Sequence, residues 1–232
     1  LSKFFFAPRL VSKQITISPW SRMFGGKTVS AENKIDVILR PNLEERMNRI
    51  LKSTQLTSRR KGFYGNFLLY GKPGTGKTLW AEKLAREANM DFVVMSGPSF
   101  DQFETGEAIK EIKNLFSWVN TRKHGVLLFI DEADSFLEDR STLHPHRVSV
   151  LNEWINQTGT ESDKFMCVYE TNRPEILDPA VQSRVAASIE FETPQEHEIL
   201  LMLQLYVKKY ITDGRKLGTF KRAQGLHSDW LK

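Results

Sequence analysis

The chain reads Gly71-Lys72-Pro73-Gly74-Thr75-Gly76-Lys77-Thr78 between the apolar run Phe67–Tyr70 and a predicted amphipathic helix that continues from Leu79. A buried strand, a glycine-rich loop and a helix in this order are typical of a phosphate-binding loop. Backbone N–H groups converge on the phosphates there, and the helix N-terminus adds a partial positive charge. A plain Gly/Pro turn is the alternative, which the complete pattern disfavours. We therefore predict that residues 71–79 bind ATP or ADP, with Lys77 on the β/γ oxygens and the Thr78 hydroxyl on Mg²⁺.

A second motif is an acidic pair at the end of another apolar run. Val126–Ile130 is continuously apolar and leads into Asp131-Glu132-Ala133-Asp134. Two acids that close a buried strand are costly to desolvate unless a cation or a water network receives them. In a phosphate-loop protein the first acid supports the Mg²⁺ shell and the second polarises the attacking water. The sequence therefore predicts an ATPase, with Asp131 as a metal-binding residue and Glu132 as a catalytic one.

Length and composition indicate the broad class of protein. With 232 residues, 40% of them hydrophobic and 26% charged, the chain has room for one large core or one core with an appendage. No run approaches the roughly 18 apolar residues that a membrane helix needs. Residue 1 is Leu, from which we expect a processed or partial chain. Cys167 stands alone in an apolar run, so we predict a buried, inert thiol with neither a disulfide nor a metal.

Residues 1–31 form a basic arm. They hold five basic residues and no acidic one, and this accounts for the whole excess of 33 Lys and Arg over 28 Asp and Glu. Such a stretch is a transit-peptide remnant, a segment near anionic lipid, or a solvated linker. Phe4-Phe5-Phe6 has the character of a docking patch. The arm lacks the clustered charges and interleaved aromatics of a nucleic-acid surface, so no direct nucleic-acid binding is predicted.

Strands and helices alternate along the rest of the chain, which predicts an α/β fold with a parallel five-stranded sheet between helices and a ligand at the carboxyl ends of the strands. We assign residues 32–193 to a large nucleotide-binding subdomain and residues 194–232 to the beginning of a small helical one. The predicted strands are Phe67–Tyr70, Phe92–Met95, Val126–Asp131, Phe165–Glu170 and Ser188–Phe191, and the main helices begin near Leu43, Leu79, Glu107, Val148 and Glu196.

The two motifs, together with Thr171-Asn172-Arg173-Pro174 and Leu177-Asp178-Pro179-Ala180, resemble those of AAA+ ATPases of the P-loop class. More narrowly, the chain from about residue 11 to about residue 211 is similar to the mitochondrial group named ATPase family AAA domain-containing protein 3. The segments that carry this closer resemblance are Lys13–Trp20, Leu43–Tyr70, Asn114–Thr121 and Asp163–Met166.

This resemblance implies a Mg²⁺-dependent ATPase of the mitochondrial inner membrane, with its ATPase domain on the matrix side. It implies assembly into a homo-oligomeric ring or a mitochondrial multi-subunit complex, and membrane association through regions outside this chain. Hydrolysis would then be coupled to remodelling or organisation of membrane- and nucleoid-associated partners. The alternative is a nucleotide-holding structural subunit of a larger mitochondrial complex that does not cycle.

The resemblance also implies roles for two further residues and shows three departures. Asn172 matches the polar sensor of the γ-phosphate, and Arg184 matches the arginine finger that acts on a neighbouring subunit's nucleotide. Many relatives have a second arginine where this chain has Ser183, and threading members have an aromatic residue where it has Glu104. The small subdomain should supply a second sensor arginine, and no residue here is given that role.

Overall fold

The structure is a computed structural model that describes residues 8–15 and 35–208. Most of the basic arm predicted over residues 1–31, including Phe4–Phe6, therefore lies outside the described residues, as does the part of the predicted small helical subdomain from residue 209 onward.

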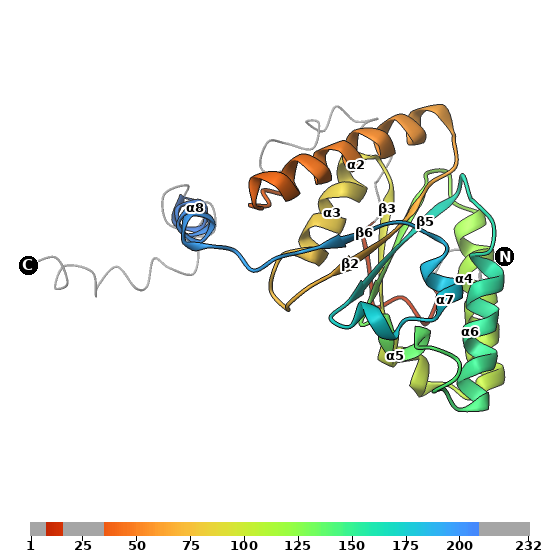
Figure 1. Cartoon of the computed structure of the whole chain (residues 1–232). Coiled ribbons are helices and arrows are strands. Elements are labelled where there is room, and N and C mark those ends of the chain that lie inside the picture. The colour runs from red at the N-terminus through yellow and green to blue at the C-terminus, as the bar shows by residue number, and fades with distance from the viewer. Residues whose placement is uncertain (1–7, 16–34, 209–232) are drawn as a thin grey trace, which may run out of the picture. The chain divides into compact units, whose positions relative to one another are not determined.

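A six-stranded sheet lies between the helices of the unit that ends at Thr193 (Figure 1). Its strand order is β1-β3-β4-β5-β2-β6. The five strands β3, β4, β5, β2 and β6 run parallel, as predicted. The additional strand β1 pairs antiparallel with β3 at one edge, and the sequence does not reveal it because three residues carry no extended apolar run. The strands are β1 (Lys13–Ile15), β2 (Asn66–Tyr70), β3 (Asp91–Ser96), β4 (Val126–Asp131), β5 (Phe165–Thr171) and β6 (Val185–Glu190).

Helices cover both faces of this sheet (Figure 1). One face carries α2 (Pro41–Arg60) and α3 (Lys77–Glu87), and the other carries α4 (Thr105–Asn120) and α6 (Pro145–Gln157). Because both faces are covered, the central strands β4 and β5 are almost entirely buried, which explains their continuous apolar sequences. The shorter connecting helices are η3 (Gly97–Gln102), α5 (Asp134–Leu137), η4 (Pro174–Ile176) and α7 (Pro179–Gln182).

The core between the sheet and α4 and α6 is rich in aromatic side chains. Trp154 is fully buried, and its ring centroid lies 5.4–6.2 Å from those of Phe100, Phe116 and Phe136. Its indole N–H donates to the Tyr169 hydroxyl at 3.2 Å, so the polar atom of this large side chain is satisfied.

Cys167 lies on β5 and is buried without a disulfide partner. Burial raises the pKa of its thiol to about 12. The thiolate is therefore disfavoured at neutral pH, in agreement with the inert thiol that the sequence predicts.

The carboxyl ends of the parallel strands meet at one edge of the sheet. β2 ends at Tyr70, directly before the glycine loop, and β4 ends at Asp131. Tyr70 lies opposite Thr171 of β5, and Ile130 of β4 lies opposite Tyr169. The topology therefore places the glycine loop and the acidic pair at the same edge, where open α/β sheets bind ligands.

Asp178 fixes the segment between β5 and β6. Its buried carboxylate accepts hydrogen bonds from the Arg140 guanidinium, with both N–O distances 2.9 Å, and from the Ala180 amide at 2.8 Å. The amide bond caps the N-terminus of α7. The Arg140 hydrogen bonds lower the pKa of Asp178, so the carboxylate stays ionised at neutral pH and holds the chain leading to Arg184.

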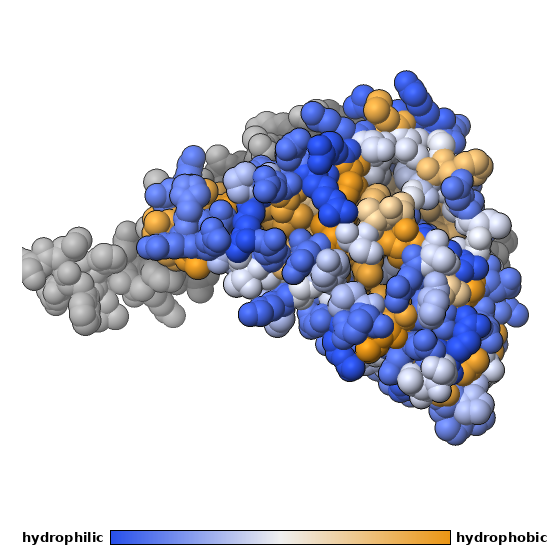
Figure 2. Space-filling view, in the orientation of Figure 1, coloured by the Kyte–Doolittle hydropathy of each residue, from blue (hydrophilic) through white to orange (hydrophobic). Residues whose placement is uncertain are grey.

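One compact unit holds the sheet and its helices and extends to Thr193, and a second takes in Ile38–Arg40 and begins again at Pro194. The second contains α8 (Glu196–Val207), which opens with a capping box between Gln195 and Glu198. Apolar side chains are visible on the surface of α8 (Figure 2). Among the described helices, none combines the length and the apolarity needed to cross a bilayer.

Candidate active site

The glycine loop starts at the end of β2 and turns directly into α3. Gly71 has a φ of 134°, and a Cβ at this position would overlap the carbonyl oxygen of Phe191. Gly76, with a φ of 95°, is the N-cap of α3. Only glycine adopts this backbone without strain, and at Gly71 only glycine leaves room for the neighbouring chain. The glycine loop therefore makes a tight curl between β2 and α3.

The N-terminus of α3 leaves backbone donors open. Trp80 is the first residue of the helix whose amide reaches a carbonyl, that of Gly76, at 2.9 Å. Within the described ranges, the amides of residues 76–79 donate no hydrogen bond. These orphan donors and the helix dipole together attract an oxyanion. The predicted phosphate loop therefore presents an anion site made of backbone groups.

Lys77 lies inside the curl of this loop, and its side chain is only 4% exposed. The ammonium nitrogen lies 2.6 Å from the carbonyl oxygen of Gly71 and 2.8 Å from that of Lys72. It also lies 2.9 Å from a carboxylate oxygen of Glu170, at the end of β5. Lys77 is thus drawn to the centre of the loop, where the sequence places it against a phosphate.

Glu170 is a site residue that the sequence analysis does not identify. It lies between Lys77 and the acidic pair, because its other carboxylate oxygen accepts a weak 3.4 Å hydrogen bond from the Glu132 amide. Burial raises the pKa of Glu170, the neighbouring Asp131 carboxyl raises it further, and Lys77 opposes both effects. Lys77 pairs with Glu170, and the Glu132 amide that donates to Glu170 also donates to the Asp131 carboxylate at 3.1 Å, so Lys77 and Asp131, predicted to face the same nucleotide, lie on either side of one buried side chain. The sequence does contain a signal for Glu170, because this acid follows the apolar run of β5 in the same way that Asp131 follows the apolar run of β4.

Glu132 occupies an unusual backbone position at the end of β4. Its φ is 50°, in the left-handed region that residues other than glycine rarely adopt, and its side chain is exposed. Its carbonyl approaches Gly97 so closely that a Cβ there would overlap both this oxygen and the Ser135 hydroxyl. The turn thus directs Glu132 away from the core, and Gly97 makes room for it.

A side chain at position 97 should disturb the turn at Glu132. Replacing Gly97 with Ala should displace the turn, lower the free energy of unfolding by about 2 kcal/mol, and lower the predicted ATP hydrolysis at least about tenfold. Thermal unfolding and phosphate release measure the two effects. The matched control is Gly106→Ala, because an added Cβ meets no atom within 4 Å there. Equal unfolding midpoints for the two variants would contradict the close approach of Gly97 to Glu132.

Thr78 and Asp131 are the residues predicted to hold Mg²⁺. Thr78 is the second residue of α3 and is exposed, and Asp131 is partly exposed at the end of β4. In the described part of the chain, no three or more His, Cys, Asp or Glu side chains form a metal-binding group. Mg²⁺ commonly binds through one or two protein oxygens together with phosphates and water. A hydroxyl and a carboxylate beside an anion site fit a metal ion that arrives with a nucleotide.

Asn172 directly follows β5 and is exposed at the same edge of the sheet. The preceding Thr171 is fully buried, and its hydroxyl donates to the Asp134 carboxylate at 2.5 Å. The Thr171 hydroxyl also accepts a hydrogen bond from the Arg173 amide at 2.9 Å. Asn172 is therefore held between two anchored neighbours, and its role as a γ-phosphate sensor stays a prediction.

Arg184 lies away from this edge. It directly precedes β6, whose first residue Val185 pairs with Asn66 at the start of β2, whereas the glycine loop follows the end of β2. Five strand residues separate the two ends, a distance of roughly 16 Å. An arginine side chain does not span this distance, so Arg184 does not act on the phosphate loop of its own chain.

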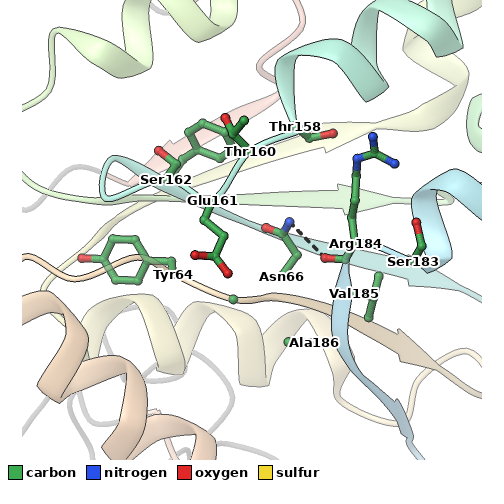
Figure 3. A pocket seen from close by; sticks show the side chains of 13 residues that line it. Tyr64, Asn66, Thr158, Thr160, Glu161, Ser162, Ser183, Arg184, Val185 and Ala186 are labelled. Carbon is green, nitrogen blue, oxygen red and sulfur yellow. Dashed lines mark hydrogen bonds between the residues drawn. The ribbon is translucent and has the colours of Figure 1, made fainter.

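Arg184 lines a cavity of about 310 Å³ at the starting ends of β2 and β6 (Figure 3). Its guanidinium donates to the Ala180 carbonyl at 2.5 Å, and its own carbonyl accepts from the Asn66 side chain at 3.4 Å. The Ser183 hydroxyl also donates to Ala180, at 3.0 Å. The structure thus separates Arg184 from Lys77, Asp131 and Glu132, which it brings together.

Threading members of the AAA+ class have an aromatic residue at the position of Glu104. The neighbouring Phe103 is not free to take its place. It packs against the hydrophobic core, and the guanidinium of Arg9 lies 4.9 Å above its ring. Arg9 also pairs with Glu107. The segment from the basic arm that contains β1 therefore covers Phe103 from outside.

Comparison with known proteins agrees with this geometry. Residues 67–193 match the family model for the ATPase family associated with various cellular activities (AAA). The ATPase family AAA domain-containing protein 3-B of Xenopus laevis is 41% identical over 177 residues, which are 75% of this chain and 30% of that protein. The corresponding human protein 3A is 38% identical over 186 residues, 78% of this chain and 32% of that protein. The chain spans about a third of the length of the relatives it matches.

Proposed function

Because the chain belongs to the AAA family of ATPases, we propose that it binds ATP with Mg²⁺ at the glycine loop and hydrolyses the bound nucleotide. The observation that carries this proposal is the position of Glu170, which pairs with Lys77 and shares the Glu132 amide with Asp131, beside the open amides of residues 76–79. A cation, backbone donors and a carboxylate of the kind that binds Mg²⁺ therefore surround one site at the carboxyl edge of the sheet, which supports the proposal.

Each predicted residue has a separate task in this proposal. The amides of residues 76–79 and Lys77 bind the phosphates, and the Thr78 hydroxyl and Asp131 hold the metal ion. The metal ion neutralises charge on the phosphate oxygens when it is bound. Glu132 accepts a proton from the attacking water, and Asn172 orients that water and responds to the γ-phosphate.

The binding half of this proposal is tested by Lys77→Met. We expect Mg²⁺–ATP affinity to fall at least about a hundredfold, because the variant loses a charge-assisted contact to the phosphates in a buried site. Titration with a fluorescent ATP analogue measures the affinity, and circular dichroism checks that the variant is folded. The control is Lys110→Met, which removes an exposed lysine from α4. Undiminished binding by a folded Lys77→Met variant would refute the proposed site.

An oligomeric ring completes the proposed active site. Arg184 lies roughly 16 Å along the strands from its own loop, so it reaches a nucleotide only if another copy of the chain places its loop beside Arg184. The Arg184 guanidinium would then donate its hydrogen bonds to the neighbour's phosphates and no longer to the Ala180 carbonyl. This fits the family resemblance and a closed, head-to-tail arrangement of subunits.

We further place the protein at the mitochondrial inner membrane, with the ATPase domain on the matrix side and its membrane attachment outside this chain. The support is the similarity to the ATPase family AAA domain-containing protein 3 relatives. The hydrolytic cycle would remodel or organise membrane- and nucleoid-associated partners. Because Phe103 is covered by Arg9, remodelling by an aromatic grip on a threaded polypeptide is not part of this proposal.

The second candidate function is a structural subunit that holds a nucleotide without turning it over. It is favoured by the hydrogen bond from the Arg184 guanidinium to the Ala180 carbonyl of its own chain, and by Ser183, which stands where the AAA+ resemblance implies a second arginine. Turnover that rises with protein concentration, as subunits assemble, would support the ATPase. Nucleotide that stays bound without phosphate release in the assembled protein would support the structural subunit.

A further inference from the structure

The Lys77 ammonium has no free hydrogen-bond donor. An ammonium group has three N–H donors. The Gly71 carbonyl, the Lys72 carbonyl and the Glu170 carboxylate lie 2.6, 2.8 and 2.9 Å from the nitrogen. A phosphate oxygen that binds Lys77 must therefore displace one of these three acceptors.

Glu170 is the acceptor that phosphate would displace. The two carbonyls belong to the loop backbone, which turns at the positive φ of Gly71 and starts from Tyr70, whose carbonyl accepts a 2.7 Å hydrogen bond from the Phe191 amide. The Glu170 carboxylate ends a side chain with three rotatable bonds, and it is the charged member of the three. Like a phosphate group, it presents anionic oxygens that accept hydrogen bonds from an ammonium, so it occupies the same kind of place on Lys77.

The negative groups around Glu170 make its displacement from Lys77 unfavourable unless a bound cation offsets their charge. Glu170 is 7% exposed, and Asp131 and the Glu132 amide are its other neighbours. A carboxylate that leaves Lys77 stays beside Asp131 and close to the incoming phosphates, all of which are negative. A divalent cation at Asp131 offsets this repulsion, whereas a metal-free nucleotide adds to it.

We propose that Glu170 is a positioning residue that holds Lys77 in the nucleotide-free loop and must be displaced by the phosphates, so that its charge weakens nucleotide binding most strongly when Mg²⁺ is absent. This inference rests on the proposed function, because it takes the glycine loop to be the ATP site. Glu170 thereby couples nucleotide affinity to the presence of the metal ion.

Glu170→Gln tests this inference, because glutamine has nearly the same shape without the charge. ADP and ATP affinities are measured by equilibrium titration, once with EDTA and once with saturating Mg²⁺. We expect the metal-free affinities to rise about tenfold and the Mg²⁺-bound affinities to change less than about threefold. Glu175→Gln is the matched control, since it removes the same charge from a side chain that is 67% exposed. This control should change neither affinity.

The ratio of metal-free to Mg²⁺-bound affinity distinguishes positioning from a purely structural role, because loss of a structural contact lowers both affinities alike. An unchanged ratio in Glu170→Gln, or weaker binding in both conditions, overturns the inference. Glu170→Ala should reproduce the direction of the change and guards against misfolding of the first variant.

If Lys77→Met abolishes binding and Glu170→Gln leaves the ratio unchanged, the inference fails and the ATP site stands. If the wild-type protein binds no nucleotide, the proposed function itself fails.

Discussion

Replacing Glu132 with Gln is expected to lower ATP hydrolysis at least about a hundredfold and to leave Mg²⁺–ATP affinity within about threefold of the wild-type value. Glu132 is exposed at the site edge, and its left-handed backbone directs the carboxylate away from the core. Glutamine retains the size and hydrogen-bonding reach of this side chain but does not accept a proton from water. The change therefore removes general-base catalysis while the phosphate loop remains intact.

Phosphate release at saturating ATP measures the rate in this variant, and titration with a fluorescent ATP analogue measures its affinity. The charge control is Glu175→Gln, which lies on the exposed connection after β5. We expect this control to hydrolyse ATP at the wild-type rate. If Glu132→Gln turns over ATP as fast as the control, Glu132 does not activate the water.

Replacing Arg184 with Ala should lower hydrolysis by the assembled protein at least about a hundredfold, with little change in nucleotide affinity for isolated subunits. The reason is the location of Arg184 at the starting ends of β2 and β6, opposite the phosphate loop. From there the guanidinium reaches only a nucleotide held by a neighbouring copy, and in the proposed ring it stabilises charge on that nucleotide. Arg49→Ala, which removes an arginine that is 69% exposed on α2, is the control and should keep full activity.

Mixing two inactive variants separates action on a neighbour from a structural role within the chain. Arg184→Ala subunits keep Glu132, and Glu132→Gln subunits keep Arg184. In a mixed ring, roughly a quarter of the interfaces combine an intact Glu132 with an intact Arg184 from the next subunit. The mixture should therefore recover measurable hydrolysis. A mixture as inactive as either variant alone would show that Arg184 does not act across an interface.

The phosphate loop and the acidic strand could be predicted from the sequence because each is a local pattern. The glycines at 71, 74 and 76 report the backbone conformation directly, since the left-handed φ values that they adopt exclude most other residues. The continuous apolar runs before Gly71 and Asp131 report burial on both faces of a parallel sheet. Since the strands run in parallel, their carboxyl ends and the two motifs meet without further information.

Features that depend on contacts between distant segments could not be predicted in this way. Glu170 meets Lys77 only because β5 lies between β4 and β2, an order that the sequence does not state. Gly97 is required by the path of the chain at Glu132, which lies 35 positions later. The edge strand β1 is held by β3, and its three residues have no strand pattern of their own.

The central claim is that a nucleotide lies between the glycine loop and the carboxylates at the ends of β4 and β5. The most direct test is a crystal structure of the protein with Mg²⁺ and a slowly hydrolysed ATP analogue. The account predicts phosphate oxygens at the amides of residues 76–79, Lys77 moved from Glu170 to a phosphate, and Mg²⁺ near Thr78 and Asp131. An analogue bound elsewhere, or a loop that stays empty with the Lys77–Glu170 pair intact at saturating analogue, would contradict it.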